Sequence, residues 1–174
     1  MEHLVIRPAR PEDLESIWSM VSRAVTHMNA LGNPQWGPDY PTRDFYAGDI
    51  QRGELYAALR GDKLAGVACI NTSESPEYDP LPWATSRPAM VIHRMAVDPD
   101  CQRGGVGAAL FRFAEEEARR RGLTAMRIDT YSLNNRMQAL FQKMGFTPVG
   151  TIHLHGRPLP YPCFEKNLAI GETK

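Results

Sequence analysis

The sequence lacks an excess of charge of either sign. Its 174 residues include 20 lysines and arginines against 20 aspartates and glutamates, so the formal net charge is zero with neutral histidines. A chain without a net positive field has no general electrostatic attraction for nucleic acid or for an anionic membrane surface. We therefore expect no nucleic acid and no membrane among its partners.

Cysteine is scarce, and long apolar runs are missing. The three cysteines, Cys69, Cys101 and Cys163, are odd in number and far apart, which argues against a disulfide framework or a zinc knuckle and favours a reducing compartment. No apolar stretch approaches the roughly 20 residues of a membrane helix. The start "MEHLVIRPARPEDLE" does not resemble an export signal. These features predict a cytoplasmic protein.

The chain is otherwise of ordinary globular composition, with 43% hydrophobic residues, and its length predicts one domain over residues 1–174. Hydrophobic periodicity and turn signals predict the element order β-α-α-β-β-β-α-β-α-β-β, an α/β domain with a mixed sheet. Strands are expected near 3–8, 54–60, 63–71, 89–97, 123–131, 147–156 and 161–168. Helices are expected near 10–32, 43–53, 104–122 and 134–146.

Three glycines, Gly104, Gly105 and Gly107, fall within four residues where the third helix begins. A glycine inside a helix costs about 1 kcal/mol relative to alanine. At a helix start, however, it lets a phosphate approach backbone N–H groups that have no partner of their own. No Walker loop is present, and Leu110 stands where a dinucleotide loop would have its last glycine. The segment predicts a phosphate cradle of another type.

The string Gln102-x-x-Gly105-x-Gly107 resembles the [RQ]-x-x-G-x-[GA] loop of the Gcn5-related N-acetyltransferase (GNAT) superfamily. "IDTYSLNNRMQALFQKMGF" is similar to the family's next motif, N-x-x-A-x-x-L-Y-x-x-x-G-F, with Asn134 as its asparagine and Gly145 in its G-F ending. The resemblance implies a single-domain GNAT-like fold. Its central sheet would be mostly antiparallel, with about seven strands flanked by about four helices.

The resemblance also implies acetyl-CoA as co-substrate. Its pyrophosphate would lie on the backbone N–H groups of Gln102, Arg103, Gly104, Gly105, Val106, Gly107 and Ala108, and its pantetheine arm would bind the main chain of Met95, Ala96 and Val97. Asn134 would contact the pantetheine or only cap the next helix. The acceptor would be a primary amine of a small molecule, amino acid or peptide, attacking the thioester directly in a ternary complex. The oligomeric state stays open, with a homodimer as one alternative.

One position departs from the family pattern. Phe141 stands where these enzymes commonly have a tyrosine that acts as the general acid. The resemblance nevertheless implies that this position contacts the donor. The thiolate could leave without an acid, since a thiol has a pKa of only about 8.5. Alternatively Tyr131 or Ser132 could supply the proton, although packing is another role for Tyr131. A third alternative is an acyl-CoA-binding module without efficient turnover.

His93 is the candidate general base, because an unperturbed histidine titrates near pH 6.5 and can accept the proton of the amine. Strand alternation would place it on the same face as Met95 and Val97, with Arg94 on the opposite face in a structural or substrate-facing role. The alternative for His93 is a histidine that only makes hydrogen bonds in the core.

The acceptor site would be formed by "ALGNPQWGPDYP" and "HLHGRPLPYPCFEK". Trp36, Tyr40 and Tyr161 could bind an amine by stacking or cation–π contact, or they could form a hydrophobic lid. His153 and His155 would lie on one face of a strand. Since nothing beyond these and His93 has metal-ligand spacing, we expect no metal.

Overall fold

The structure is a computed structural model that describes residues 3–169. Within that range its strands and α-helices follow the predicted order: β1 (Leu4–Pro8), α1 (Leu14–Ala30), α2 (Arg43–Gln51), β2 (Leu55–Arg60), β3 (Lys63–Asn71), β4 (Met90–Val97), α3 (Val106–Arg120), β5 (Ala125–Asp129), α4 (Asn135–Lys143), β6 (Thr147–Ile152) and β7 (Tyr161–Asn167). Residues 1, 2 and 170–174 of the predicted domain lie outside the described residues. Among those described, no helix is both long and apolar enough to cross a bilayer.

The strands form one mixed sheet in the order β1-β2-β3-β4-β5-β7-β6. Pairing is antiparallel between β1 and β2, β2 and β3, β5 and β7, and β6 and β7. The pairing of β4 with β5 is parallel and joins Met90 to Met126 and Val91 to Arg127. The α/β fold with a mostly antiparallel sheet of seven strands is therefore confirmed.

The chain divides into two compact units, and both β4 and α3 run from one unit into the other. The first unit comprises Met1–Ile70 and His93–Leu110. In its core, Ile17 of α1 and Tyr46 of α2 pack with Cys69 of β3. On the opposite face of β3, a Cβ added to Gly66 would lie 2.8 Å from a methyl of Val106, so this glycine lets the start of α3 lie close to the strand.

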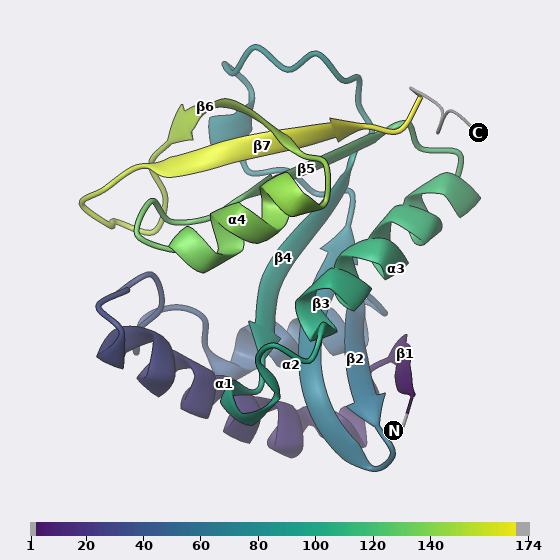
Figure 1. The fold of residues 1–174 in the computed structure, drawn as a ribbon, viewed down its shortest axis with the longest axis vertical. Coiled ribbons are helices and arrows are strands. Elements are labelled where there is room, and N and C mark those ends of the chain that lie inside the picture. The colour runs from purple at the N-terminus through teal and green to yellow at the C-terminus, as the bar shows by residue number, and fades with distance from the viewer. Residues whose placement is uncertain (1–2, 170–174) are drawn as a thin grey trace. The chain divides into compact units, whose positions relative to one another are not determined.

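The second unit comprises Asn71–Ile92 and Phe111–Lys174. In Figure 1, α4 lies in front of β5 and below β7 in the view. Phe141 of this helix belongs to an aromatic cluster with ring centroids 5.1–6.2 Å apart, formed by Phe111, Phe141, Phe146 and Phe164. A smaller cluster contains Tyr78, Tyr131, Ile152, Tyr161 and Cys163. Because adjacent strand residues point to opposite faces, Cys163 and Phe164 of β7 serve different clusters.

Candidate functional site

β4 has an irregular backbone at the point where the donor is expected to bind. Arg94 has a φ of +48°, in the left-handed region that non-glycine residues rarely adopt. His93 and Arg94 are both half-buried, whereas Met95 and Ala96 are buried. A left-handed residue interrupts the two-residue period of a strand, so the prediction from alternation that His93 shares a face with Met95 does not carry past Arg94.

The side chain of Arg94 is held by α2. Its Nε and Nη2 donate to the two carboxylate oxygens of Asp49, each at 2.7 Å, and its Nη1 donates to the Tyr40 hydroxyl at 3.2 Å. The Arg94 side chain is 12% exposed and that of Asp49 is 0% exposed. Burial lowers the pKa of Arg94, but the hydrogen bonds to Asp49 and Tyr40 outweigh it and hold the pKa above its ordinary value. Of the two roles left open for Arg94, the structure supports the structural one.

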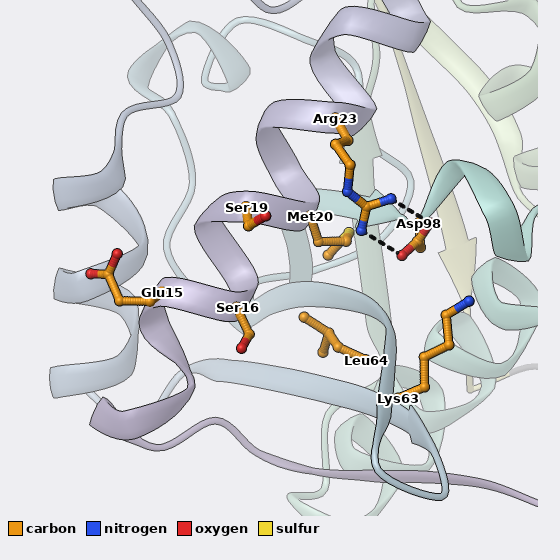
Figure 2. A pocket seen from close by; sticks show the side chains of 8 residues that line it. All are labelled: Glu15, Ser16, Ser19, Met20, Arg23, Lys63, Leu64 and Asp98. Carbon is orange, nitrogen blue, oxygen red and sulfur yellow. Dashed lines mark hydrogen bonds and ion pairs between the residues drawn. The ribbon is translucent and has the colours of Figure 1, made fainter.

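The segment after β4 is anchored to α1 (Figure 2). Arg23 donates to both carboxylate oxygens of Asp98, at 3.1 and 2.8 Å, and Asp98 also accepts a hydrogen bond from the Asp100 N–H at 2.9 Å. The Arg23 hydrogen bonds hold the pKa of Asp98 below its usual value. An open groove of about 450 Å³ lies here, lined by Glu15, Ser16, Ser19, Met20, Arg23, Lys63, Leu64 and Asp98.

The glycine loop has the backbone conformation of a cradle. Arg103 and Gly105 have φ angles of +72° and +75°, and α3 begins immediately afterwards at Val106. The N–H groups of Val106, Gly107 and Ala108 therefore belong to the first helical turn, in which an α-helix leaves its N–H groups without intrahelical acceptors. Turns that combine left- and right-handed residues direct successive N–H groups at an anion.

Gly104 has no room for a side chain. A Cβ at this position would lie 2.7 Å from Nη1 of Arg60 and 3.0 Å from the Cys101 carbonyl oxygen. Arg60 also donates a hydrogen bond to the carbonyl of Gly104. Gly104 and Gly105 are both exposed. The loop thus has the open, glycine-lined surface that a phosphate needs.

Two residues of the second motif lie on or beside α4. Asn134 is the N-cap residue, and its side-chain oxygen accepts a hydrogen bond from the Met137 N–H at 3.1 Å. The predicted capping role is therefore present, and donor contact stays a prediction. Phe141 is 0% exposed within the aromatic cluster. A phenylalanine in this setting has no proton to donate.

Residues 23–146 match the model of the acetyltransferase (GNAT) family. The chain belongs to the GNAT family. It is 25% identical to the uncharacterized N-acetyltransferase YesJ of Bacillus subtilis over 147 residues, which cover 82% of this chain and 81% of that protein. The activity class is therefore GNAT-type acetyltransferase, with acetyl-CoA-dependent acetylation as its general reaction.

Solved structures agree with this assignment. A GNAT-family acetyltransferase from Streptococcus agalactiae superposes with a TM-score of 0.80 and 25% identity, covering 94% of this chain and 95% of that one. The protein yncA from Salmonella typhimurium shares the fold, with a TM-score of 0.69 and 21% identity over 98% of this chain and 96% of its own. That protein was solved with its cofactor acetyl-CoA.

In this GNAT chain the predicted acid Tyr131 is enclosed by neighbours. Its side chain is 0% exposed, and its ring centroid lies 5.0 Å from that of Tyr161. Its hydroxyl accepts a hydrogen bond from the Leu159 N–H at 3.2 Å. Ser132, the other hydroxyl considered, is half-buried. The surroundings of Tyr131 favour the packing role.

The predicted acceptor aromatics differ in accessibility. Trp36 is 6% exposed and Tyr161 2% exposed, whereas Tyr40 is half-buried. Phe45, which sequence reasoning missed, is 41% exposed, and its ring packs edge-on against Tyr40 with 5.0 Å between centroids. Phe45 and Tyr46 are adjacent aromatic residues on α2, so the sequence does not show which of them faces solvent. In the structure Tyr46 is buried in the core and Phe45 is exposed.

Asp129 is a second residue that sequence reasoning missed. It ends β5, and the Tyr78 hydroxyl donates a hydrogen bond to its carboxylate at 2.5 Å. Burial raises the pKa of Asp129 from 3.8 to about 6, against the lowering effect of that hydrogen bond. An aspartate at a strand end is a weak signal, because its hydrogen-bond partner Tyr78 is distant in sequence.

The histidines considered as metal ligands lie elsewhere than predicted. β6 ends at Ile152, so His153 and His155 follow the strand rather than sharing one of its faces. The strand is shorter than predicted because the chain turns there, with His155 at a φ of +55°. Over residues 3–169 no group of three or more histidine, cysteine, aspartate or glutamate side chains could hold a metal ion.

Proposed function

We propose that this protein transfers an acetyl group from acetyl-CoA to a primary amine of a small molecule, amino acid or peptide. The amine would attack directly while both substrates are bound. The observation that carries the proposal is the loop before α3, where left-handed Arg103 and Gly105 lead into the first helical turn. In GNAT-type chemistry this is where the donor's pyrophosphate would bind.

The donor site would be built mainly from main-chain atoms of the first unit. The N–H groups from Gln102 to Ala108 would hold the pyrophosphate, and the main chain of Met95, Ala96 and Val97 would hold the pantetheine arm. Backbone donors at the start of a helix suit a phosphate because they are fixed in place and carry the positive end of the helix dipole. Asn134 and Phe141 remain predicted donor contacts of the second unit.

Acetyl-CoA supplies a thioester whose carbonyl carbon accepts the amine. A C–N bond forms, the C–S bond breaks, and negative charge develops on the carbonyl oxygen and then on the leaving sulfur. The N–H of Met95 or Val97 would stabilise the oxygen, since a fixed donor at a developing charge lowers the barrier. The thiolate would leave without a protein acid, because Phe141 cannot donate and a thiol has a pKa of only about 8.5.

His93 would take the proton that the amine loses, directly or through one water. Its half-buried position on β4 places it next to the strand's irregular residue and two residues before Met95. Tyr131 stays a weaker candidate for proton transfer. Among the predicted acceptor residues Trp36, Tyr40 and Tyr161, the half-buried Tyr40 offers the more accessible ring.

Calorimetric titration with CoA tests the donor site, using Gly105→Glu as the variant. Gly122→Glu is the matched control, because both glycines are exposed, have a φ of +75° and have open space around an added Cβ. We expect Gly105→Glu to abolish CoA binding by placing an anion in the cradle, while Gly122→Glu binds like the parent. Equal affinity of a folded Gly105→Glu variant would overturn the proposed donor site.

Release of free thiol from acetyl-CoA, measured against a panel of amines, tests the transfer reaction itself. Turnover that depends on one class of amine supports the proposal and names the acceptor. CoA binding without amine-dependent release would instead identify an acyl-CoA-binding module. We also propose that residues 1–174 act as one catalytic domain in the cytoplasm, which is compatible with the absence of a disulfide among the described residues.

A further inference from the structure

The peptide between Arg94 and Met95 is turned out of its regular strand orientation. In a strand, carbonyl and N–H groups lie in the plane of the sheet and bond to neighbouring strands. The left-handed φ of +48° at Arg94 rotates this carbonyl toward α2, where it accepts a hydrogen bond from the Tyr46 hydroxyl at 3.2 Å. The first unit therefore holds one peptide of β4 from the side of a helix.

This orientation determines where the next N–H points. The Arg94–Met95 peptide is trans, and in a trans peptide the C=O and N–H bonds point in opposite directions. Since the Arg94 carbonyl points at Tyr46 on α2, the Met95 N–H points away from α2. Met95 N–H is one of the two groups proposed to stabilise the thioester oxygen.

The same helix holds both ends of Arg94. Tyr46 and Asp49 are three residues apart, so they lie on one face of α2. Tyr46 binds the Arg94 carbonyl, while Asp49 binds the guanidinium through two hydrogen bonds of 2.7 Å. Oδ1 of Asp49 also accepts a hydrogen bond of 2.6 Å from Arg52, so two arginines hold the carboxylate. Two contacts to one rigid helix leave this strained residue little freedom to relax.

We propose that Tyr46, Asp49 and Arg94 are positioning residues that fix the Arg94–Met95 peptide and thereby aim the Met95 N–H at the thioester carbonyl oxygen. This inference rests on the proposed acetyl transfer and adds to it the residues that prepare its oxyanion donor. A non-glycine residue in a left-handed conformation persists only where its surroundings enforce it, and here the enforcing contacts are the two from α2.

Arg94 does not fit the competing role of binding an acidic acceptor. Its Nε and Nη2 are committed to Asp49 and its Nη1 to Tyr40, and its side chain is 12% exposed. A carboxylate on a substrate would have to displace Asp49, which is 0% exposed and accepts from Arg52 as well. The guanidinium thus anchors this part of β4 to α2 through Asp49.

Tyr46→Phe is the decisive variant, because it removes only the hydroxyl and keeps the ring that packs in the core. We expect kcat at saturating amine to fall about 10- to 100-fold, because the Met95 N–H would be displaced rather than removed; outright loss of an oxyanion donor costs about 10²–10³-fold. Affinity for CoA, which has no thioester carbonyl, should not change. Tyr56→Phe is the matched control, since it removes a hydroxyl from another buried tyrosine of the same unit, and it should keep the parent kcat.

An infrared difference spectrum separates positioning from a general loss of structure. Acetyl-CoA labelled at the carbonyl carbon gives a stretching band whose frequency drops when a donor polarises the bond. We expect the bound band to move to higher frequency in Tyr46→Phe and to stay at the parent position in Tyr56→Phe. An unchanged kcat and an unchanged band in Tyr46→Phe would overturn the proposal.

Asp49→Asn provides a second and independent variant, with Asp13→Asn as its control. Asp13 also binds an arginine, Arg7, through two hydrogen bonds, at 2.8 and 3.1 Å, but it lies outside β4 and α2. We expect Asp49→Asn to lower kcat about tenfold or more, with the same upward shift of the carbonyl band. A folded Asp49→Asn variant that matches the parent in both would contradict the proposal. If the parent itself shows no turnover, the proposed function fails instead.

Discussion

The two units of this protein differ in how their family motifs are held, by polar contacts in the first unit and by apolar packing in the second. In the first unit, Arg94 of β4 and Arg103 of the following loop have strained, left-handed backbones, and ion pairs to the buried carboxylates of Asp49 and Asp98 hold the segment. In the second unit, the corresponding family motif on α4 ends in a cluster of four phenylalanines. Strain is tolerated where surrounding contacts enforce it, whereas close apolar packing contributes stability.

From this contrast we expect the first unit to determine mainly the rate of acetyl transfer and the second unit mainly the stability of the fold. Changes that leave the buried ion pair of Arg94 and Asp49 intact, such as His93→Ala, should alter the rate of acetyl transfer while changing stability little. Changes in the aromatic cluster of the second unit should alter stability while changing the rate little.

His93→Ala should slow acetyl transfer by about 10²–10⁴-fold, the usual contribution of a general base. In the parent, kcat/KM should fall on the acid side as the general base becomes protonated, and the variant should lack that limb. CoA affinity should stay unchanged because the glycine loop is untouched. Stopped-flow or steady-state thiol release over a pH series makes the measurement.

A control variant and a second substitution test the role of His93. His27→Ala changes another half-buried histidine of the first unit, on α1, and should turn over like the parent. His93→Gln can still order a water but cannot hold the proton near neutral pH, so it should lose the acid limb as well. If His93→Ala and His93→Gln both match the parent, His93 is a structural histidine.

Phe164→Ala should destabilise the protein by about 3–5 kcal/mol, the range for emptying a buried phenylalanine site. Phe164 is 3% exposed, and its ring lies 5.1 Å from that of Phe141. Denaturant unfolding measures the change, with the half-buried Phe113→Ala as a milder comparison. A large fall in kcat of the folded variant without loss of stability would contradict the division between the units.

Asp129→Asn should change the pH dependence of stability. The folded pKa of about 6 lies above the ordinary 3.8, so the stabilising effect of the protonated carboxyl is complete below about pH 4 and is lost as the pH rises through about 6. The amide keeps an acceptor for Tyr78 and has no charge to bury. Relative to the parent, Asp129→Asn should therefore gain stability between pH 4 and 7, by about 1–3 kcal/mol. Unfolding curves that stay parallel across this range would show that Asp129 does not titrate with folding.

The element order and the glycine loop could be predicted because they depend on local signals. Apolar periodicity marks the helices and strands, and Gly104, Gly105 and Gly107 mark the start of α3 whatever the rest of the chain does. The hairpin at Gly61 and Asp62 is equally local, with β2 ending at Arg60 and β3 beginning at Lys63. The family motifs then connected these elements to a donor.

The support of β4 could not be predicted, because it depends on contacts between distant residues. Alternation assumes a regular strand, and nothing in "VIHRMAV" indicates that Arg94 is left-handed. That conformation depends on Tyr46 and Asp49, more than forty residues earlier. The raised pKa of Asp129 likewise depends on burial beside Tyr78.

Phe141→Tyr is the change with the smallest expected effect on the rate. If the thiolate leaves without a protein acid, restoring the hydroxyl common in this family should change kcat by less than about tenfold, or 1.4 kcal/mol. The new hydroxyl would instead enter a site that is 0% exposed and surrounded by phenylalanines. Burying a hydroxyl without a partner costs about 1–3 kcal/mol, so denaturant unfolding should detect a loss that steady-state kinetics barely register. A hundredfold gain in kcat would contradict departure of the thiolate without an acid, because it would show that the parent reaction is limited by the missing hydroxyl at position 141. The second unit would then determine the rate as strongly as the first.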